Sequence, residues 1–326
     1  MALTRRRFLL TAAASIARPT VVRAQVQPLA IGMVPANAIY WNIDVAAEKG
    51  FFRAAGFEPQ IFAVQSSPQA VQQAILGAYQ LAVAQPEVFI AGVEHGATML
   101  GAIAAPVNRA DWRLMVLPDI HTFTDLRGKI IGVSTPRSGE VWLTRQLLER
   151  AGLRRGEFDF QVVGVSPQKL AALQKGAIAA TVMYEPSAEL AAQQGFPSLA
   201  HYSDLRAFQP VLYMVSRDWA GKQDNGKRLA RVIRQAHEWL WDPTNRAEAV
   251  AVLMKSTKRD KPIIDAVYEE YFVTRKIYSR DGEIDPVGIE TVLADMAEDG
   301  QVSSPPPPAS KFLLDRELGG LWSGGP

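Results

Sequence analysis

Cysteine is absent from this chain of 326 residues, and histidine occurs only four times. A chain without cysteine has no disulfide framework and none of the cysteine-based zinc patterns. The histidines also lack the spacings by which two imidazoles of one helix bind a metal ion; they stand at positions 95, 121, 201 and 237. We therefore expect neither a metal site nor a cofactor.

The sequence also lacks any apolar run long enough to span a membrane. No G-x-S-x-G elbow or G-x-G-x-x-G turn occurs, and the turn that comes closest to a phosphate loop has Arg228 where a hydroxyl should bind magnesium. With 48% apolar and 21% charged residues, the chain is typical of a folded protein of about two domains. The usual evidence for an enzyme is missing, and we expect a protein that is not an enzyme.

The formal charge of +2 hides an uneven distribution of charged residues. Residues 1–24 contain five arginines and no acidic residue, so that 30 basic and 33 acidic residues remain in the rest of the chain. A mildly acidic chain has no basic stripe that could neutralise phosphate groups. We therefore expect no nucleic-acid partner.

The first 24 residues have the pattern of an export signal. Residues 5–7 are all arginine and precede a short apolar stretch, which is followed by small residues up to Ala24. The apolar part is too short for a permanent membrane anchor, and the arginines followed by Phe8 resemble a twin-arginine signal. We expect the mature chain to begin near Gln25 and to be free in the periplasm.

Short apolar runs alternate with helix-length amphipathic segments in the rest of the chain, which predicts an α/β fold with helices on the faces of its sheets. The pattern begins at Leu29 and restarts at Asp125, so that two α/β units fit the length. The last third is almost purely helical, and we expect it to pack back on one of the two units. We assign residues 25–118 plus 210–326 to lobe I and residues 119–209 to lobe II.

Three predicted helices begin directly after strands and have small or polar residues in their first turns. Unpaired backbone N–H groups make such helix starts binding sites for anions, and ligands bind at the carboxyl ends of strands in open sheets. The candidates are Asn37, Ser66, Ser67, Ser134, Arg137, Ser138 and Gly139. Alternatively, each serine merely caps its own helix, and Glu140 already neutralises the third helix start.

Aromatic and acidic side chains stand close to the same loops. Tyr40 and Trp41 follow the first candidate loop, and Tyr184 and Glu185 follow the last predicted strand of lobe II. The aromatic rings are candidate walls of a ligand site, although packing in the core is the commoner role of such residues. Glu185 either binds an amine or ring N–H of a ligand or caps the helix that follows it.

Several motifs, in this order and spacing, resemble one known family. They are EKGFF at 48–52, DLRGKIIGV at 125–133, LLERAGL at 147–153, AALQKG at 171–176 and EP at 185–186. Together they are similar to the periplasmic substrate-binding proteins of ABC importers for taurine, alkanesulfonates, nitrate and thiamine pyrimidine precursors. The resemblance implies a two-lobed type II periplasmic binding protein fold, with two crossover strands and a ligand cleft between the lobes. By position, it adds Gln85 to the expected residues of that cleft.

The resemblance and the missing enzyme motifs together predict the periplasmic solute-binding component of an ABC importer. We expect a monomer that captures a small anionic or zwitterionic organic molecule, sulfonate-, nitrate- or carboxylate-like, and delivers it to a permease in the inner membrane. Two alternatives stay open. One is an enzyme similar to the pyrimidine-precursor synthases of the same fold, and the other is a periplasmic receptor that serves a sensor.

Overall fold

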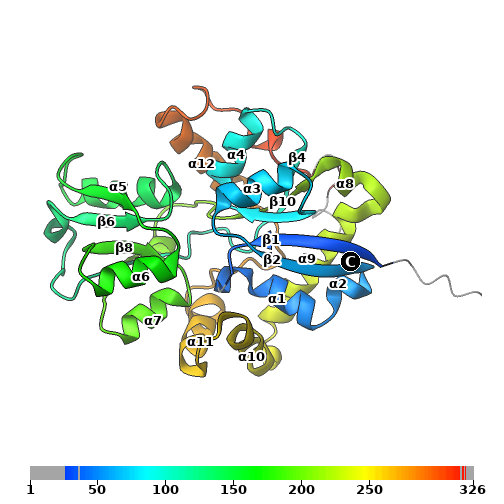
Figure 1. Cartoon of the computed structure of the whole chain (residues 1–326), viewed down its shortest axis with the longest axis horizontal. Helices are drawn as coiled ribbons and strands as arrows, with labels where there is room; N and C mark the ends of the chain where they lie inside the picture. The colour runs from blue at the N-terminus through cyan, green and yellow to red at the C-terminus, as the bar shows by residue number, and fades with distance from the viewer. Residues whose placement is uncertain (1–25, 36, 316–317, 319, 321–326) are drawn as a thin grey trace, which may run out of the picture.

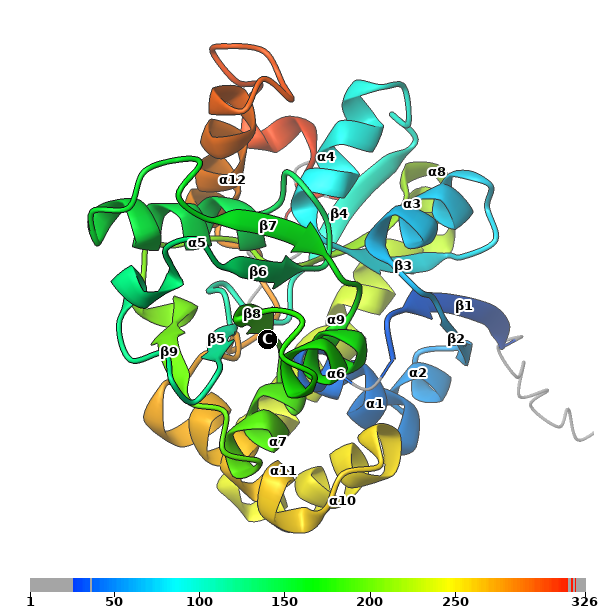
Figure 2. The same ribbon diagram turned by 60° about the vertical axis from the view of Figure 1, so that its left-hand side comes forward.

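Two five-stranded mixed sheets, one in each lobe, organise the chain (Figures 1 and 2). The computed structural model describes residues 26–35, 37–315, 318 and 320. The expected export signal at 1–24 lies outside the described residues. Within them, no helix combines the length and the apolar character that crossing a bilayer requires.

The sheet of lobe I has the strand order β2-β1-β3-β10-β4. Its strands are β1 (Gln27–Met33), β2 (Phe57–Ala63), β3 (Leu81–Ala84), β4 (Leu100–Ala104) and β10 (Leu212–Ser216). β1 runs parallel to β2 and β3, whereas β10 is antiparallel to β3 and β4. The loops that follow β1, β2 and β3 therefore meet at one edge of this sheet.

The sheet of lobe II repeats this arrangement in the order β7-β6-β8-β5-β9. Its strands are β5 (Arg113–Val116), β6 (Ile130–Val133), β7 (Asp159–Val162), β8 (Ala180–Met183) and β9 (Ser198–His201). β6 is parallel to β7 and β8, and β5 is antiparallel to β8 and β9. The loops after β6, β7 and β8 thus also lie at one edge.

Each sheet contains one antiparallel strand that the chain reaches by crossing between the lobes. β10 joins the first sheet after the whole of lobe II, and β5 joins the second sheet directly after β4. The expected boundary at 118/119 therefore lies too late in the chain, because β5 pairs with β8 and β9 of lobe II. All four residues of β5, Arg113 included, are buried, and a short buried strand of this kind gives no signal of which sheet it joins.

Helices pack on both faces of the first sheet, with α3 and α4 on one side and α1, α2 and α9 on the other (Figure 1). The helices before lobe II are α1 (Trp41–Glu48), α2 (Phe51–Ala54), α3 (Ser67–Ile75) and α4 (Pro86–Glu94). Those of lobe II are α5 (Gly139–Arg150), α6 (Ser166–Gln174) and α7 (Ser187–Gln193).

The chain after β10 is helical, as the sequence predicts, but it contacts both lobes. Its helices are α8 (Arg217–Gly221), α9 (Asn225–Trp241), α10 (Arg246–Thr257), α11 (Lys261–Tyr268) with a π-helical extension (Glu269–Thr274), and α12 (Pro286–Glu298). α9 packs against α1, and α12 packs against α4, whereas α11 also contacts α7 of lobe II. The tail therefore packs back on lobe I through α9, α10 and α12, and α11 adds a contact with lobe II.

Trp41 lies in the core of lobe I and not in a ligand site. Its side chain is fully buried, and its indole N–H donates a hydrogen bond to the carbonyl of Ala249 at 2.9 Å. The edge of the ring meets the rings of Tyr268 and Phe272, with centroids 5.9 and 5.6 Å apart. Trp41 therefore attaches α1 to the helical tail, which is the core-packing alternative for this residue.

We expect Trp41→Ala to lower the free energy of unfolding by about 3–5 kcal/mol, because it leaves a large cavity between α1 and the tail. Urea unfolding followed by circular dichroism measures this loss. Leu76→Ala is the control, since Leu76 is 70% exposed and its truncation should change stability by less than about 0.5 kcal/mol. Equal stability of Trp41→Ala and the unmodified protein would contradict the core role of Trp41.

Candidate functional site

A cavity of about 270 Å³ lies between the two lobes. Its lining includes eight of the expected site residues, namely Asn37, Tyr40, Ser66, Ser67, Gln85, Ser134, Tyr184 and Glu185. Apolar side chains complete much of the wall, among them Val34, Val64, Val165 and Val211. The volume is close to the lower end of the range for small-molecule sites, and the mixture of apolar walls and a few polar groups is typical of them.

The lobes touch each other across this cavity. The Ala38 N–H of lobe I donates to the Glu185 carbonyl of lobe II at 2.9 Å. The amide of Gln85 makes two further contacts, because its Nε2 donates to Tyr184 Oη at 3.4 Å and its Oε1 accepts from Thr135 Oγ1 at 3.3 Å. These hydrogen bonds hold the two lobes closed over the cavity, so that a bound molecule is shielded from water.

Two helix starts face the cavity, one from each lobe. α3 begins at Ser67 and Pro68 after its N-cap Ser66, and α6 begins at Ser166 and Pro167. In both helices, proline occupies the first turn, where its missing N–H costs no hydrogen bond. All five of these residues except Pro68 line the cavity. The positive ends of two helix dipoles therefore lie at one enclosed space, which favours an anionic ligand.

A hydrogen bond of the same type, from a backbone N–H to a serine hydroxyl, holds the start of each of these two helices. Ser67 Oγ accepts a hydrogen bond from Gln85 N–H at 3.1 Å, and Ser166 Oγ accepts one from Tyr184 N–H at 3.4 Å. In each lobe the donor is the first residue after β3 or β8, 18 residues beyond the serine. Gln85 and Tyr184 are 99 residues apart. The two lobes thus contain an internal repeat of S-P-Q segments, at 67–69 and 166–168, which the sequence analysis missed.

The start of α5, the third expected anion site, is already occupied by carboxylates. Glu140 accepts hydrogen bonds from the N–H of Ser134 at 2.7 Å and from its hydroxyl at 2.9 Å. Glu87 of α4 accepts one from Gly139 N–H at 3.1 Å. Ser138 is fully buried and donates its hydroxyl proton to a backbone carbonyl. Ser138 and Gly139 therefore do not line the cavity, and the alternative that Glu140 neutralises this helix start fits the structure.

Arg137 also lies outside the cavity, contrary to expectation. Its side chain is exposed, and its guanidinium pairs with the carboxylate of Asp299 at 3.1 Å at the end of α12. The carbonyl of Arg137 accepts a further hydrogen bond from the side chain of Gln301 at 3.1 Å. The expected ligand cation is therefore a surface contact between the β6–α5 loop and the helical tail.

Arg259 is a cation of the cavity that the sequence analysis missed. It lies in the loop after α10, lines the cavity and is partly exposed. No hydrogen bond or ion pair links its guanidinium to another residue within the described part of the chain. Its position depends on how the helical tail packs against the lobes, and no local sequence pattern predicts that packing.

Glu185 lines the cavity, but its carboxylate is engaged elsewhere. Oε1 lies 2.6 Å from the guanidinium of Arg113, and Oε2 accepts a hydrogen bond from Glu189 N–H in the first turn of α7 at 3.0 Å. Burial raises the pKa of Glu185, and the neighbouring Arg113 opposes this shift. The alternative in which Glu185 caps the following helix therefore fits the structure better than ligand binding by its carboxylate.

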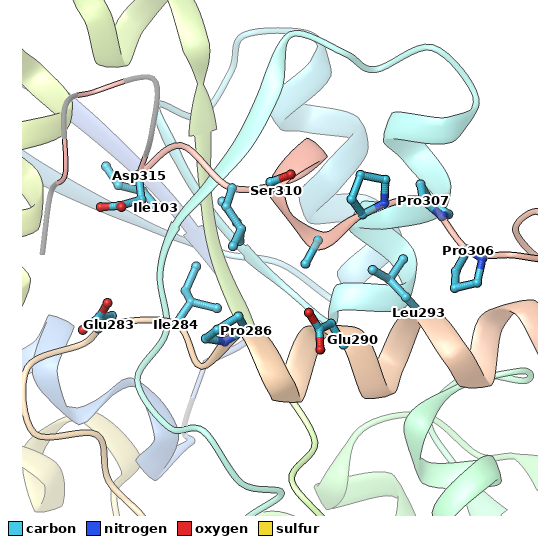
Figure 3. A pocket seen from close by; sticks show the side chains of 14 residues that line it. Ile103, Glu283, Ile284, Pro286, Glu290, Leu293, Pro306, Pro307, Ser310 and Asp315 are labelled. Atoms are coloured by element: carbon cyan, nitrogen blue, oxygen red, sulfur yellow. The ribbon is translucent and has the colours of Figure 1, made fainter. Parts of the chain in front are cut away.

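A wider cavity of about 610 Å³ lies outside the cleft, beside α12 and the prolines at 306–308 (Figure 3). Glu283, Glu290 and Asp315 line it, and among the described residues its lining includes no basic side chain. Three carboxylates disfavour an anion, whereas helix starts and Arg259 favour one. The smaller cavity between the lobes is therefore the better candidate for binding an acidic ligand.

A family model described as NMT1/THI5 like matches residues 37–246, more than half of the chain. The chain belongs to the NMT1/THI5-like family. A protein of Brucella abortus (strain 2308), provisionally named a binding protein, is 26% identical over 325 residues, which cover 95% of this chain and 98% of that relative. The resemblance expected from the sequence is thus confirmed at the level of the family.

Solved structures confirm the two-lobed fold of this NMT1/THI5-like chain. The periplasmic nitrate-binding protein NrtA from Synechocystis PCC 6803 superposes with a TM-score of 0.73 at 16% identity, over 90% of this chain and 88% of that one. The periplasmic aliphatic sulphonate binding protein SsuA from Escherichia coli superposes with a TM-score of 0.70 at 19% identity, over 88% of this chain and 92% of that one. The desulfurization enzyme DSZB superposes with a TM-score of 0.66 at 14% identity, over 90% of this chain and 97% of that one. The fold therefore occurs in binding proteins and in an enzyme.

The contact between Glu87 and Gly139 predicts a pH-dependent stability. Burial raises the pKa of Glu87 to about 7, whereas an unfolded glutamate titrates near about 4.3. The folded protein therefore binds this proton more tightly, and Glu87 lowers stability as the pH rises from about 4 to 7. Glu87→Gln retains an acceptor for Gly139 N–H and does not ionise. The difference in the free energy of unfolding between Glu87→Gln and the unmodified protein should therefore shift in favour of Glu87→Gln by roughly 2–3 kcal/mol when the pH is raised from 5 to 8.

Urea unfolding of both proteins at the two pH values measures this gain. Other titrating groups are common to both and cancel in the comparison. Glu290→Gln is the matched control, because Glu290 is exposed. This substitution should change the free energy of unfolding by the same small amount at both pH values. A pH-independent difference for Glu87→Gln would show that Glu87 does not hold a proton in the folded state.

Proposed function

We propose that this chain is the solute-binding component of an ABC importer and that it binds a small organic anion or zwitterion between its lobes. The observation that carries the proposal is the closed cavity that two helix starts and Arg259 line together, where no other group in the described part of the chain pairs with Arg259. Backbone N–H groups and a guanidinium bind an acid group well, because both are fixed donors in a space shielded from water. The apolar walls and the ring of Tyr40 then contact the body of the ligand.

The names of the similar proteins support this class of ligand. SsuA is named for aliphatic sulphonates and NrtA for nitrate, so that proteins of this fold bind small anions. Both are described as periplasmic. We further propose that the chain acts in the periplasm as a monomer, is exported through its twin-arginine-like signal, and delivers its ligand to a permease in the inner membrane.

We propose that the protein does not catalyse a reaction. DSZB shares the fold and is an enzyme, and a variant of it with a cysteine replaced by serine was solved with a sulfinic acid. The present sequence has no cysteine, and none of its four histidines lines the cavity between the lobes. Ser134 lines it and donates its hydroxyl proton to the Glu140 carboxylate, but Ser134 N–H and Lys169 also donate to that carboxylate, and these hydrogen bonds weaken it as a base.

Thermal unfolding of the purified protein against a ligand panel tests the proposal. The panel contains alkyl and aryl sulfonates, nitrate, bicarbonate, aliphatic and aromatic carboxylates, and hydroxymethylpyrimidine. A ligand at about 100 times its Kd stabilises the folded state by about 2.7 kcal/mol and raises the unfolding midpoint. A response from one class of acid would support the proposal. Silence from every acid, or turnover of a panel compound, would contradict it.

Arg259→Gln should weaken binding of a responding acid by about 1.5–3 kcal/mol, because it removes a charge-assisted hydrogen bond. Isothermal titration calorimetry measures the change in Kd. Lys258→Gln is the matched control: it removes the same charge from the neighbouring residue, which is exposed and does not line the cavity. Equal losses in the two variants would mean that overall charge, and not contact with Arg259, determines affinity.

A further inference from the structure

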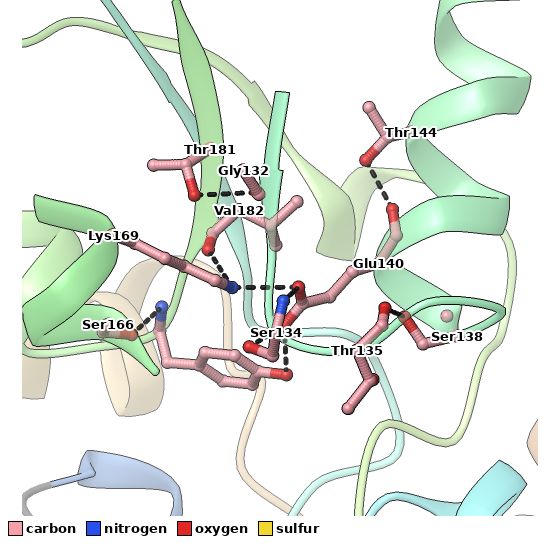
Figure 4. Close-up of polar contacts among 12 residues, drawn as sticks. Gly132, Ser134, Thr135, Ser138, Glu140, Thr144, Ser166, Lys169, Thr181 and Val182 are labelled. Atoms are coloured by element: carbon pink, nitrogen blue, oxygen red, sulfur yellow. Dashed lines mark hydrogen bonds and ion pairs between the residues drawn. The ribbon is translucent and has the colours of Figure 1, made fainter. Parts of the chain in front are cut away.

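Glu140 lies directly behind the cavity wall, and four donors saturate its carboxylate (Figure 4). Oε2 accepts from Ser134 N–H at 2.7 Å and from Lys169 Nζ at 2.9 Å. Oε1 accepts from the hydroxyls of Ser134 at 2.9 Å and Tyr184 at 3.0 Å. The side chains of Glu140 and Lys169 are fully buried. A carboxylate offers about four lone-pair positions, so Glu140 has none left for a ligand.

This network fixes where the hydroxyl protons point. Carboxylate oxygens accept hydrogen bonds, so Ser134 and Tyr184 donate their hydroxyl protons to Glu140. Ser134 Oγ then presents lone pairs to the cavity, whereas Tyr184 Oη already accepts from Gln85 Nε2 at 3.4 Å. Thr135 likewise donates its proton to Gln85 Oε1 at 3.3 Å. Ser134, Thr135 and Tyr184 line the cavity. The hydroxyls of Ser134 and Thr135 can therefore accept hydrogen bonds from a ligand but cannot donate them.

The serine hydroxyls at the starts of α3 and α6 have the opposite orientation, because they accept hydrogen bonds from the protein and keep their protons for a ligand. Ser66 Oγ accepts from Gln69 N–H at 3.4 Å, and the hydroxyls of Ser67 and Ser166 accept from backbone N–H groups as described above. The hydroxyl protons of these three serines have no acceptor within the described part of the chain, and they remain available to a ligand. With Arg259, they form a donor region in the same cavity as the acceptor hydroxyls.

We propose that the ligand carries two different groups: an acid that binds the donor region, and an amine or hydroxyl that donates to Ser134 Oγ. This inference rests on the proposed function, since it concerns the same cavity. Glu140 is then a positioning residue, because it does not touch the ligand but determines what the Ser134 hydroxyl can bind. An acid without a donor leaves the Ser134 acceptor unpaired when the lobes close, and unpaired buried groups lower affinity.

Matched pairs of probes test this specificity by calorimetry. Each pair has the same acid and nearly the same shape, but a methyl group replaces the amine: taurine and propane-1-sulfonate, β-alanine and butyrate, 4-aminobenzoate and 4-methylbenzoate. One pair should have an acid group and a body that fit the cavity. In that pair, we expect the compound with the amine to bind at least about tenfold more tightly than its methyl analogue. Isethionate, which has a hydroxyl in place of the amine of taurine, should resemble taurine.

Two variants locate the origin of the preference. Ser134→Ala removes the acceptor of the proposal, so the ratio of Kd values within the pair should fall several-fold toward one. Glu140→Gln replaces an acceptor oxygen by an N–H donor, frees a hydroxyl proton and should lower the same ratio. Tyr202→Phe is the control, because Tyr202 is buried in the same lobe, bonds to Thr144 and does not line the cavity. It should leave the ratio unchanged even if it lowers stability.

The outcomes separate the two proposals. Equal binding of both members of a pair, or an unchanged ratio in Ser134→Ala, would overturn the inference and leave the proposed binding function in place. If Glu140→Gln does not fold, Ser134→Ala alone still decides, since it removes only one hydroxyl group. No binding of any of the seven probes would count against both the inference and the proposed function.

Discussion

The hydrogen bond from a strand-end N–H to a serine hydroxyl, made once in each lobe, determines the geometry of the cleft. Ser67 accepts from Gln85, and Ser166 accepts from Tyr184. Each bond attaches the first turn of a helix to the end of the neighbouring strand, so that the helix N-terminus and the side chain of the donor residue both face the cavity. Gln85 and Tyr184 then meet across it, through the bond from Nε2 to Oη. The site is therefore built from two copies of one unit, placed face to face.

Buried carboxylates decide which helix starts remain available to a ligand. Glu87 and Glu140 satisfy the N–H groups at and before the start of α5, whereas no side-chain carboxylate contacts the starts of α3 and α6 in the described part of the chain. Positive potential is thus confined to one region of the cleft, where Arg259 adds to it. The same carboxylates join α5 to its surroundings, since Glu87 comes from lobe I and Gly139 from lobe II. Closure of the lobes and the shape of the electrostatic field therefore depend on the same contacts.

The sequence predicts the fold and the loops of the cleft because both follow from local patterns: apolar strands, proline-started helices and serine caps. Those patterns do not predict which contacts form between distant segments. Trp41 follows a cleft loop but lies on the buried side of α1, against residues of the tail more than two hundred positions away. Arg137 stands in the expected loop, yet α12 supplies its partner Asp299. Arg259 reaches the cavity only because the helical tail contacts both lobes. Each difference arises from tertiary packing of the tail.

The buried pair of Lys169 and Glu140 explains how a polar core element can serve specificity without touching a ligand. Two apolar side chains of similar volume would pack there at a similar or higher stability, because the desolvation of two charges offsets much of their attraction. Apolar side chains, however, would leave the protons of Ser134 and Tyr184 free to rotate, and both hydroxyls could then donate as well as accept. The ion pair removes that freedom, since Lys169 holds the Glu140 carboxylate in place and Glu140 accepts both protons. The polarity of the cavity wall thus follows from a charge that lies one layer behind it.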